Sequence, residues 1–157
     1  MVVSKELEIF LKNSENQDLI NKNTKESWEK IYRGDFPKGF TEILLKSGVN
    51  DPAEKLEYIP NYYLYSSNIS DYIIPDGVID IGYAAFGVCR NLKNVWIPKS
   101  VMHLCNKVFE NTSLISITYE GTKEEAIKCG IGDSSKKHWR EDSQVKKIIC
   151  TNGIIEL

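Results

Sequence analysis

The sequence lacks the features that mark membrane, secreted and nucleic-acid-binding proteins. No run of about 18 apolar residues could span a membrane. The first residues, MVVSKELEIFLKNSENQ, lack the apolar core of a secretory signal peptide. The chain has 20 Lys plus Arg against 22 Asp plus Glu, a net charge of -2, and neither half is basic. We therefore expect a cytoplasmic protein that binds neither membrane nor nucleic acid.

Cysteine is scarce and widely spaced. The four cysteines are Cys89, Cys105, Cys129 and Cys150. No CxxC pair occurs, and the missing signal peptide indicates a reducing compartment. These features predict reduced, mostly buried thiols rather than a disulfide framework or a zinc site.

Catalytic groups are also scarce, because His103 and His138 are the only histidines. The sequence has no glycine-rich phosphate loop, no HExxH and no DxDxDG calcium loop. His103 lies two residues from Cys105, but a solvated histidine beside a buried cysteine is the favoured interpretation over catalysis. His138 is expected in a surface loop. We therefore predict no enzyme activity, no cofactor, no metal and no small-molecule substrate.

Residues 1–58 are expected to form helices. Three segments place apolar residues at helical spacing, and the first two follow a residue that can cap a helix. These segments are Ser4 with Leu7, Phe10 and Leu11; Thr24 with Trp28, Ile31 and Tyr32; and Phe40, Ile43, Leu44 and Leu45 before Gly48. Asp51, Pro52 and Glu54 fit the start of a short fourth helix. The segment Asn13–Asn23 is expected to be a polar connector.

From residue 59 onwards the sequence repeats itself at a nearly constant interval. At an offset of 23 residues, the matching pairs are Pro75 with Pro98, Val78 with Val101, Ile81 with Leu104, and Phe86 with Phe109. At an offset of 22, they are Leu92 with Leu114, Val95 with Ile117, and Ile97 with Tyr119. A degenerate first unit begins near Tyr62. Repeats of this length with a Leu-x-x-Val-x-Ile core are typical of a leucine-rich-repeat solenoid.

This pattern predicts an α+β protein with a small solenoid of about 2.5 repeats of 22–23 residues. The expected short parallel strands are residues 72–74, 95–97 and 117–119, and the expected helical turns are Tyr83–Phe86 and Lys107–Phe109. We predict three regions: a helical cap at 1–58, repeats at 59–120 and a closing segment at 121–157. The closing segment should hold a helix after Thr122, a polar loop, and a β-hairpin that turns at Asn152-Gly153.

The unit from Ile74 to Pro98 resembles the BspA-type leucine-rich repeat. Its letters, IPDGVIDIGYAAFGVCRNLKNVWIP, place Pro, Gly, Phe and Leu together at the positions expected for that family. The next unit, Ile97–Tyr119, is looser, with Cys105 in the place of Gly82. The later segments YEGTKEE and CTNG are also similar to the ending of family members. The resemblance covers residues 60–157.

The resemblance implies a noncatalytic module that binds another protein through its sheet face, in many members as a cell-surface adhesin. Short forms without a signal peptide and with a helical N-terminal segment resemble proteins carried by bacteriophages or prophages. That resemblance implies an inhibitor that occludes a host protein in the host cytoplasm, such as a component of antiviral defence. The alternative is a structural, self-assembling subunit or an adhesin-like surface protein.

Strand alternation predicts which residues form the sheet face. If the core residues of each strand point inward, their neighbours point outward and align across the strands. The candidate partner-binding residues are Trp96, Ile73, Asn94, Asp71, Thr118, Ser116 and Ile149. Ile73, Trp96 and Thr118 would form one row centred on a tryptophan, a residue type enriched at binding hot spots. Alternatively, the N-terminal helices or segment 121–144 cover this row.

A run of tyrosines lies where the helices meet the repeats. Its members are Tyr58, Tyr62, Tyr63, Tyr65 and Tyr72. Such a cluster could bind a ligand by stacking, but it is expected instead to fill the junction with its hydroxyls pointing outward.

Overall fold

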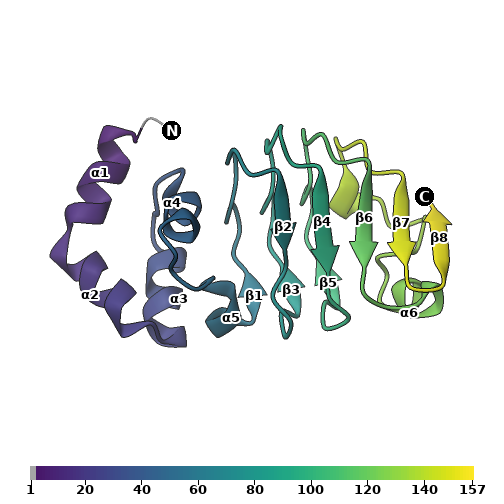
Figure 1. Cartoon of the computed structure of the whole chain (residues 1–157), viewed down its shortest axis with the longest axis horizontal. Helices are drawn as coiled ribbons and strands as arrows, with labels where there is room; N and C mark the ends of the chain where they lie inside the picture. The colour runs from purple at the N-terminus through teal and green to yellow at the C-terminus, as the bar shows by residue number, and fades with distance from the viewer. Residues whose placement is uncertain (1–2) are drawn as a thin grey trace.

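The structure, a computed structural model, describes residues 3–157. The chain is helical as far as Leu56 and then passes mainly through short strands and turns, which gives a mixed α+β fold (Figure 1). The helices are α1 Lys5–Lys12, α2 Ser14–Lys22, α3 Lys25–Arg33, α4 Phe40–Lys46, α5 Ala53–Leu56, α6 Lys123–Lys128 and the 3-10 helix η1 His138–Arg140. The strands are β1 Tyr58–Ile59, β2 Asp71–Ile73, β3 Asp80–Ile81, β4 Asn94–Ile97, β5 His103–Leu104, β6 Ser116–Tyr119, β7 Lys147–Cys150 and β8 Gly153–Glu156.

The N-terminal helices begin and end at the predicted capping residues. The Ser4 hydroxyl accepts a hydrogen bond from the Leu7 amide (3.1 Å), and Thr24 forms a capping box at the start of α3. Gly48 follows α4 with a φ of 88°, in the left-handed region where glycine is favoured. The Asp51 carboxylate accepts the Ala53 amide (3.0 Å) and so starts α5.

The predicted polar connector Asn13–Asn23 is wrong, because most of it forms α2. The Asn13 side chain accepts hydrogen bonds from the amides of Glu15 and Asn16, so it caps a second helix directly after α1. The half-buried Leu19 and Ile20 pack against the core. This mostly polar helix is therefore stabilised by the Asn13 cap and by the packing of two apolar side chains.

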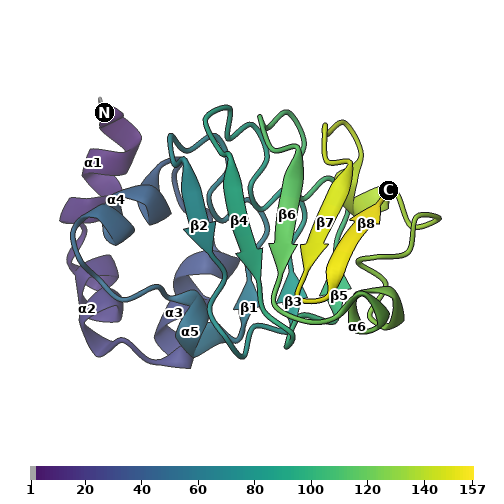
Figure 2. The ribbon, with the colours of Figure 1, turned by 45° about the vertical axis from the view of Figure 1, so that its right-hand side comes forward.

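After α5, the strands form two separate sheets (Figures 1 and 2). One sheet has the order β1-β3-β5, and the other has the order β2-β4-β6-β7-β8. All pairs are parallel except β7 with β8, and Tyr72 lies opposite Val95 while Ile81 lies opposite Leu104. These pairings confirm the interval of the sequence repeat, and β2, β4 and β6 lie within one residue of their predicted positions.

The predicted helical turns are wrong. Each turn between the two sheets contains two residues in the left-handed region, which interrupts a right-handed helix. These residues are Tyr62 and Ser66, Ala84 and Val88, and Lys107 and Asn111, with φ between 48° and 60°. Backbone bonds instead join one turn to the next, as from the Phe86 amide to the Val108 carbonyl (3.0 Å).

The segment 121–144 is more ordered than the predicted helix and polar loop. Helix α6 forms after Thr122 as expected, but η1 continues the series of stacked turns. The Lys107 amide donates to the His138 carbonyl (2.8 Å), and the ring of buried Trp139 lies 6.0 Å from that of Phe109. The turns therefore continue one step beyond the predicted repeats.

The C-terminal hairpin turns one residue earlier than predicted. Cys150 lies opposite Gly153, so Thr151 and Asn152 form the turn. The Asn152 side chain accepts the Lys123 amide (2.8 Å) and donates to Glu124 (3.0 Å), which ties the turn to α6. These side-chain bonds fix Asn152 within the turn.

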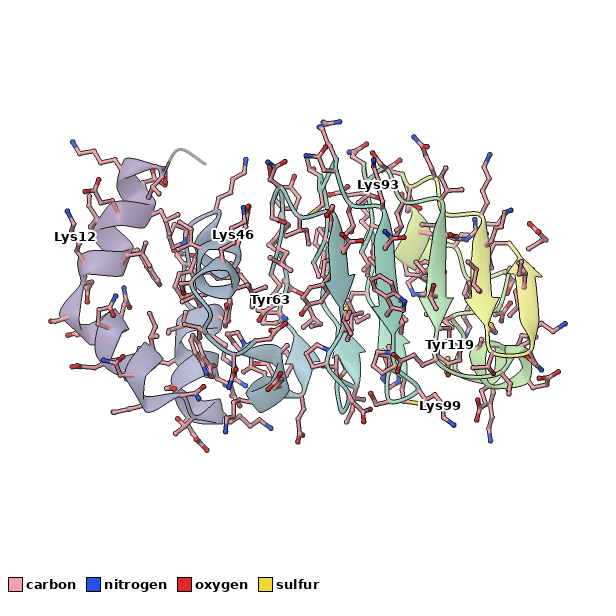
Figure 3. The ribbon with its side chains drawn as sticks, in the orientation of Figure 1. Lys12, Lys46, Tyr63, Lys93, Lys99 and Tyr119 are labelled. Carbon is pink, nitrogen blue, oxygen red and sulfur yellow. The ribbon has the colours of Figure 1, made fainter. Side chains whose placement is uncertain are left out.

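One hydrophobic core extends from the helices through the repeats. At the junction, buried Tyr63 (labelled in Figure 3) and Tyr72 both donate their hydroxyls to the Asp51 carboxylate, at 2.5 Å in the case of Tyr72. Burial, followed by nearby negative charge, raises the pKa of Tyr72 well above its usual range. The prediction that the tyrosine hydroxyls point outward is therefore wrong for these two residues.

Candidate protein-binding face

An exposed row of mainly apolar side chains, here called the apolar row, crosses the five-stranded sheet. Strand register places Ile73 opposite Trp96, then Thr118, Ile149 and Ile154 in turn. The three isoleucines are 65%, 40% and 52% exposed, while Trp96 and Thr118 are half-buried. At about 4.8 Å between strands, the row is about 19 Å long.

The orientation of the apolar row follows from strand alternation. Tyr72 and Ile74 flank Ile73 and are buried, and Val95 and Ile97 flank Trp96 in the same way. Since neighbouring side chains on a strand point to opposite faces, the core residues send the row outward. This alternation confirms the predicted inward and outward sets in β2 and β4.

A polar row runs beside the apolar row. Its members are Asp71, Asn94, Ser116, Lys147 and Glu156. The Asn94 amide donates to the Asp71 carboxylate (2.6 Å). Hydrogen bonds from Ser70 and then Asn94 lower the pKa of Asp71. The polar row therefore presents fixed hydrogen-bonding groups and charges of both signs.

No described element lies over the apolar row. In Figure 2 the large sheet faces the viewer, the N-terminal helices lie beyond β2 at the left, and α6 lies at the right-hand end. The retained exposure of Ile73, Ile149 and Ile154 agrees with this arrangement. The alternative in which the N-terminal helices or segment 121–144 cover the row is wrong.

Three residues of this face, Lys147, Ile154 and Glu156, are not among the predicted binding residues. With the turn at Thr151-Asn152, Ile149 faces Ile154 and Lys147 faces Glu156. Alternation within β8 was the signal that could have identified them, since Ile154 and Glu156 are both exposed.

The two histidines lie away from this face. His103, in β5, is bonded through Nδ1 to the Asp80 carboxylate (2.9 Å) on the neighbouring strand β3, and its side chain is 75% exposed. The exposed His138 lies in η1, and its Nε2 bonds to the Leu104 carbonyl (2.9 Å). Within residues 3–157, no three His, Cys, Asp or Glu side chains are grouped so that they could hold a metal.

The cysteines are less uniformly buried than predicted. Cys89 and Cys150 are buried, Cys129 is half-buried and Cys105 is exposed. Cys105, which follows β5, therefore does not provide the predicted buried neighbour for His103. All four thiols are free. Burial raises the pKa of Cys89, whose thiol donates to the Leu64 carbonyl (2.9 Å).

Comparison with known families gives one match. A profile described as "BspA type Leucine rich repeat region (6 copies)" matches residues 15–129, which is more than half of the chain. The match begins within α2, so it extends further toward the N-terminus than the resemblance seen in residues 60–157. No curated protein and no solved structure matches the chain.

The helices have no membrane-spanning candidate among them. No helix in the part of the chain that the structure describes is both long enough and apolar enough to cross a bilayer. The longest helices, α2 and α3, have nine residues each.

Proposed function

Because the chain belongs to the BspA-type leucine-rich repeat family, we propose that it binds another protein through the apolar row. The family is typically non-enzymatic, and leucine-rich repeats generally mediate protein–protein interaction. The observation that carries the proposal is the alignment of five outward side chains, with half-buried Trp96 second in the row, on a sheet face that no other described element covers.

The composition of the face supports this function. Ile73 and Ile154 are large apolar side chains that folding leaves more than half exposed, and they lie in one line rather than scattered. The partly sheltered Trp96 has the residue type most enriched at interface hot spots. The polar row beside it supplies donors and acceptors, as the rim of an interface does.

A more specific version of the proposal names the architecture of the chain and the class of its partner. The stacked units form a short leucine-rich-repeat solenoid, with helical segment 1–58 capping repeats 59–120 and segment 121–157 closing the far end. The chain is carried by a bacteriophage and occludes a host protein in the host cytoplasm, with an antiviral-defence component as one candidate. This version is supported by the resemblance of the chain to short phage-borne repeat proteins.

The test is a partner capture with a matched pair of double variants. The full chain is used to capture proteins from its native host, and stoichiometric partners are identified by mass spectrometry. Trp96→Ala with Ile73→Ser should weaken capture by about 2 kcal/mol or more. Ile79→Ser with Met102→Ser is the control, because these residues are exposed beside the smaller sheet.

Two outcomes would contradict the proposal. One is the absence of any stoichiometric partner. The other is equal loss of capture in both double variants. Trp96→Ala should also cost less than about 1.5 kcal/mol of the free energy of unfolding, since the indole is only half-buried. Urea denaturation of the variant separates lost binding from lost folding.

Self-assembly is the second candidate function, and the edge strand β8 favours it. β8 pairs on one side with β7 and forms the end of the sheet order. An unpaired edge that carries exposed Ile154 can pair with another chain. Light scattering over a range of concentrations tests this candidate, and a concentration-independent monomer would eliminate it.

A further inference from the structure

Two adjoining cavities lie where the helices meet the first repeat, away from the apolar row. They have volumes of about 520 Å³ and 500 Å³ and share Tyr32, Arg33 and Asn61 in their walls. Both cavities are lined by the end of α3 and by segment 58–65. The first also reaches the loop after α3, and the second reaches residues 80–82. Each volume lies in the range of small-ligand pockets. None of the residues of the apolar row contributes to either cavity.

Two tyrosine rings, one exposed and one half-buried, line the first cavity. Tyr62 and Tyr65 line it, and Tyr62 is 48% exposed. The Tyr62 ring makes T-shaped contacts with the rings of Tyr65 and Tyr83, with ring centroids 5.4 Å and 5.5 Å apart, respectively. A bond from the Tyr62 amide to the Tyr83 carbonyl (3.0 Å) fixes the backbone beneath it. Unlike buried Tyr63, Tyr62 keeps about half of its surface exposed, so its ring is available to a ligand with an apolar face.

The polar groups around the rings offer both donors and acceptors. Asn61 uses its Oδ1 to accept the Tyr83 amide (2.8 Å), and its Nδ2 group forms no hydrogen bond within the described residues. The Arg33 guanidinium is held by Glu29 (2.8 Å). Exposed Asp35 and Lys38 add a carboxylate and an ammonium group at the rim.

The charges in the first cavity balance. Arg33 and Lys38 are offset by Asp35 and Glu42. The buried Glu42 carboxylate is itself neutralised by Lys46 (2.9 Å) and accepts the Asn68 amide (3.0 Å). A strongly anionic or cationic ligand therefore gains little from this site. A neutral ligand with many hydroxyl groups and an apolar face matches it better.

We propose that this groove is a binding site for a neutral saccharide. The axial C–H face of a sugar ring packs on the exposed ring of Tyr62, and the perpendicular ring of Tyr65 lies at the edge of the sugar. Its hydroxyls, which are both donors and acceptors, bond to Asn61, Arg33 and Asp35. The second cavity, which continues past Arg33 and Asn61 toward Asp80, holds a second sugar ring. The site is independent of the protein-binding face.

Saturation-transfer NMR on the full chain tests the proposal. The probes are cellobiose, maltose, lactose and chitobiose at millimolar concentration, with AMP as an anionic aromatic control. At least one disaccharide should receive saturation from the protein, most strongly at ring C–H protons. Tyr62→Ala should reduce this signal by about fivefold or more, whereas Trp96→Ala should leave it unchanged.

A second measurement covers a Tyr62→Ala variant that fails to fold. Amide chemical shifts of the unaltered chain should move for residues 33–39 and 58–65 when the disaccharide is added. The proposal is overturned if no disaccharide receives saturation, or if shifts occur only elsewhere. It is also overturned if Tyr62→Ala binds undiminished or AMP binds more tightly than every disaccharide. Trp96→Ala separates this result from failure of the protein-binding face.

Discussion

Aromatic packing differs between the repeats and the N-terminal helices. In the repeats, Phe86 stacks on its equivalent Phe109 with ring centroids 5.6 Å apart and planes 12° apart, and Trp139 continues the column. In the helices, Tyr32 contacts Phe36, Phe40 and Tyr63, which are not equivalent positions of a repeat. Aromatic contacts in the repeats therefore join one turn to the next along a column, whereas in the helices they gather around a single residue, Tyr32.

The polar contacts between repeats also differ from those between the helices and the repeats. Between repeats, backbone amides and carbonyls of successive turns bond to one another, so side-chain identity matters little there. Between helices and repeats, two carboxylates make the link: half-buried Asp51 accepts hydrogen bonds from Tyr63 and Tyr72, and buried Glu42 accepts one from the Asn68 amide. A repeat can thus tolerate sequence drift in its turns, whereas the junction depends on particular residues.

The largest expected effect comes from breaking the aromatic column. Phe86→Ala and Phe109→Ala should each lower the free energy of unfolding by about 3 to 5 kcal/mol, because each removes a wholly buried ring and leaves a cavity. Urea denaturation followed by circular dichroism measures this. Ile79→Ala, at a 43% exposed position, is the control. A phenylalanine variant as stable as this control would contradict the proposed column.

Removing the acceptor at the junction should have the next largest effect. Asp51→Ala leaves the buried Tyr63 and Tyr72 hydroxyls without their acceptor, at a cost of about 2 to 4 kcal/mol. The same denaturation experiment applies, with exposed Asp35→Ala as the matched control. If Tyr63→Phe with Tyr72→Phe restores part of the stability of Asp51→Ala, the unpaired hydroxyls are the cause. No recovery would count against this explanation.

Alkaline pH should weaken the junction. Burial and neighbouring negative charge raise the pKa of Tyr63 and Tyr72, so the folded state keeps protons that the unfolded state releases. Their contribution is complete below about pH 10 and is lost as pH rises above it, by about 1.4 kcal/mol per tyrosine per pH unit. Denaturation at pH 9, 10 and 11 measures the slope. The slope should be shallower in Tyr72→Phe, and an unchanged slope would contradict this account.

The smallest expected effect comes from removing a helix capping box, which occurs once in the N-terminal helices and once after the repeats. Thr24 and Thr122 each form a capping box, at α3 and α6 respectively. Thr24→Ala and Thr122→Ala should each cost about 1 kcal/mol, and serine at either position should retain most of the stability. Thermal melts of the four variants give the comparison. A cost confined to one region would show that the other helix is held by packing alone.

The sequence predicted the repeats better than the junction. Register followed from spacing, since Phe86 and Phe109 lie 23 positions apart and do stack. The outward set of β2 and β4 followed from alternation around Tyr72 and Val95. The fourth turn was not predicted, because the polar insertion that contains α6 places Trp139 outside the regular interval. The proposed binding role of the outward residues stays a prediction.

The sequence by itself determined features that depend on near neighbours or on a fixed interval. These are the helix caps at Ser4 and Thr24, the parallel register and the two faces of each strand. Only the tertiary structure decided which distant groups meet. Asp51 accepts hydrogen bonds from hydroxyls 12 and 21 residues away, and Cys105 is exposed where the sequence predicted a buried thiol. Local hydrogen bonds and periodic burial depend on residues that are close in sequence or regularly spaced, so the sequence predicts them. Contacts across a junction depend on how separately formed elements pack.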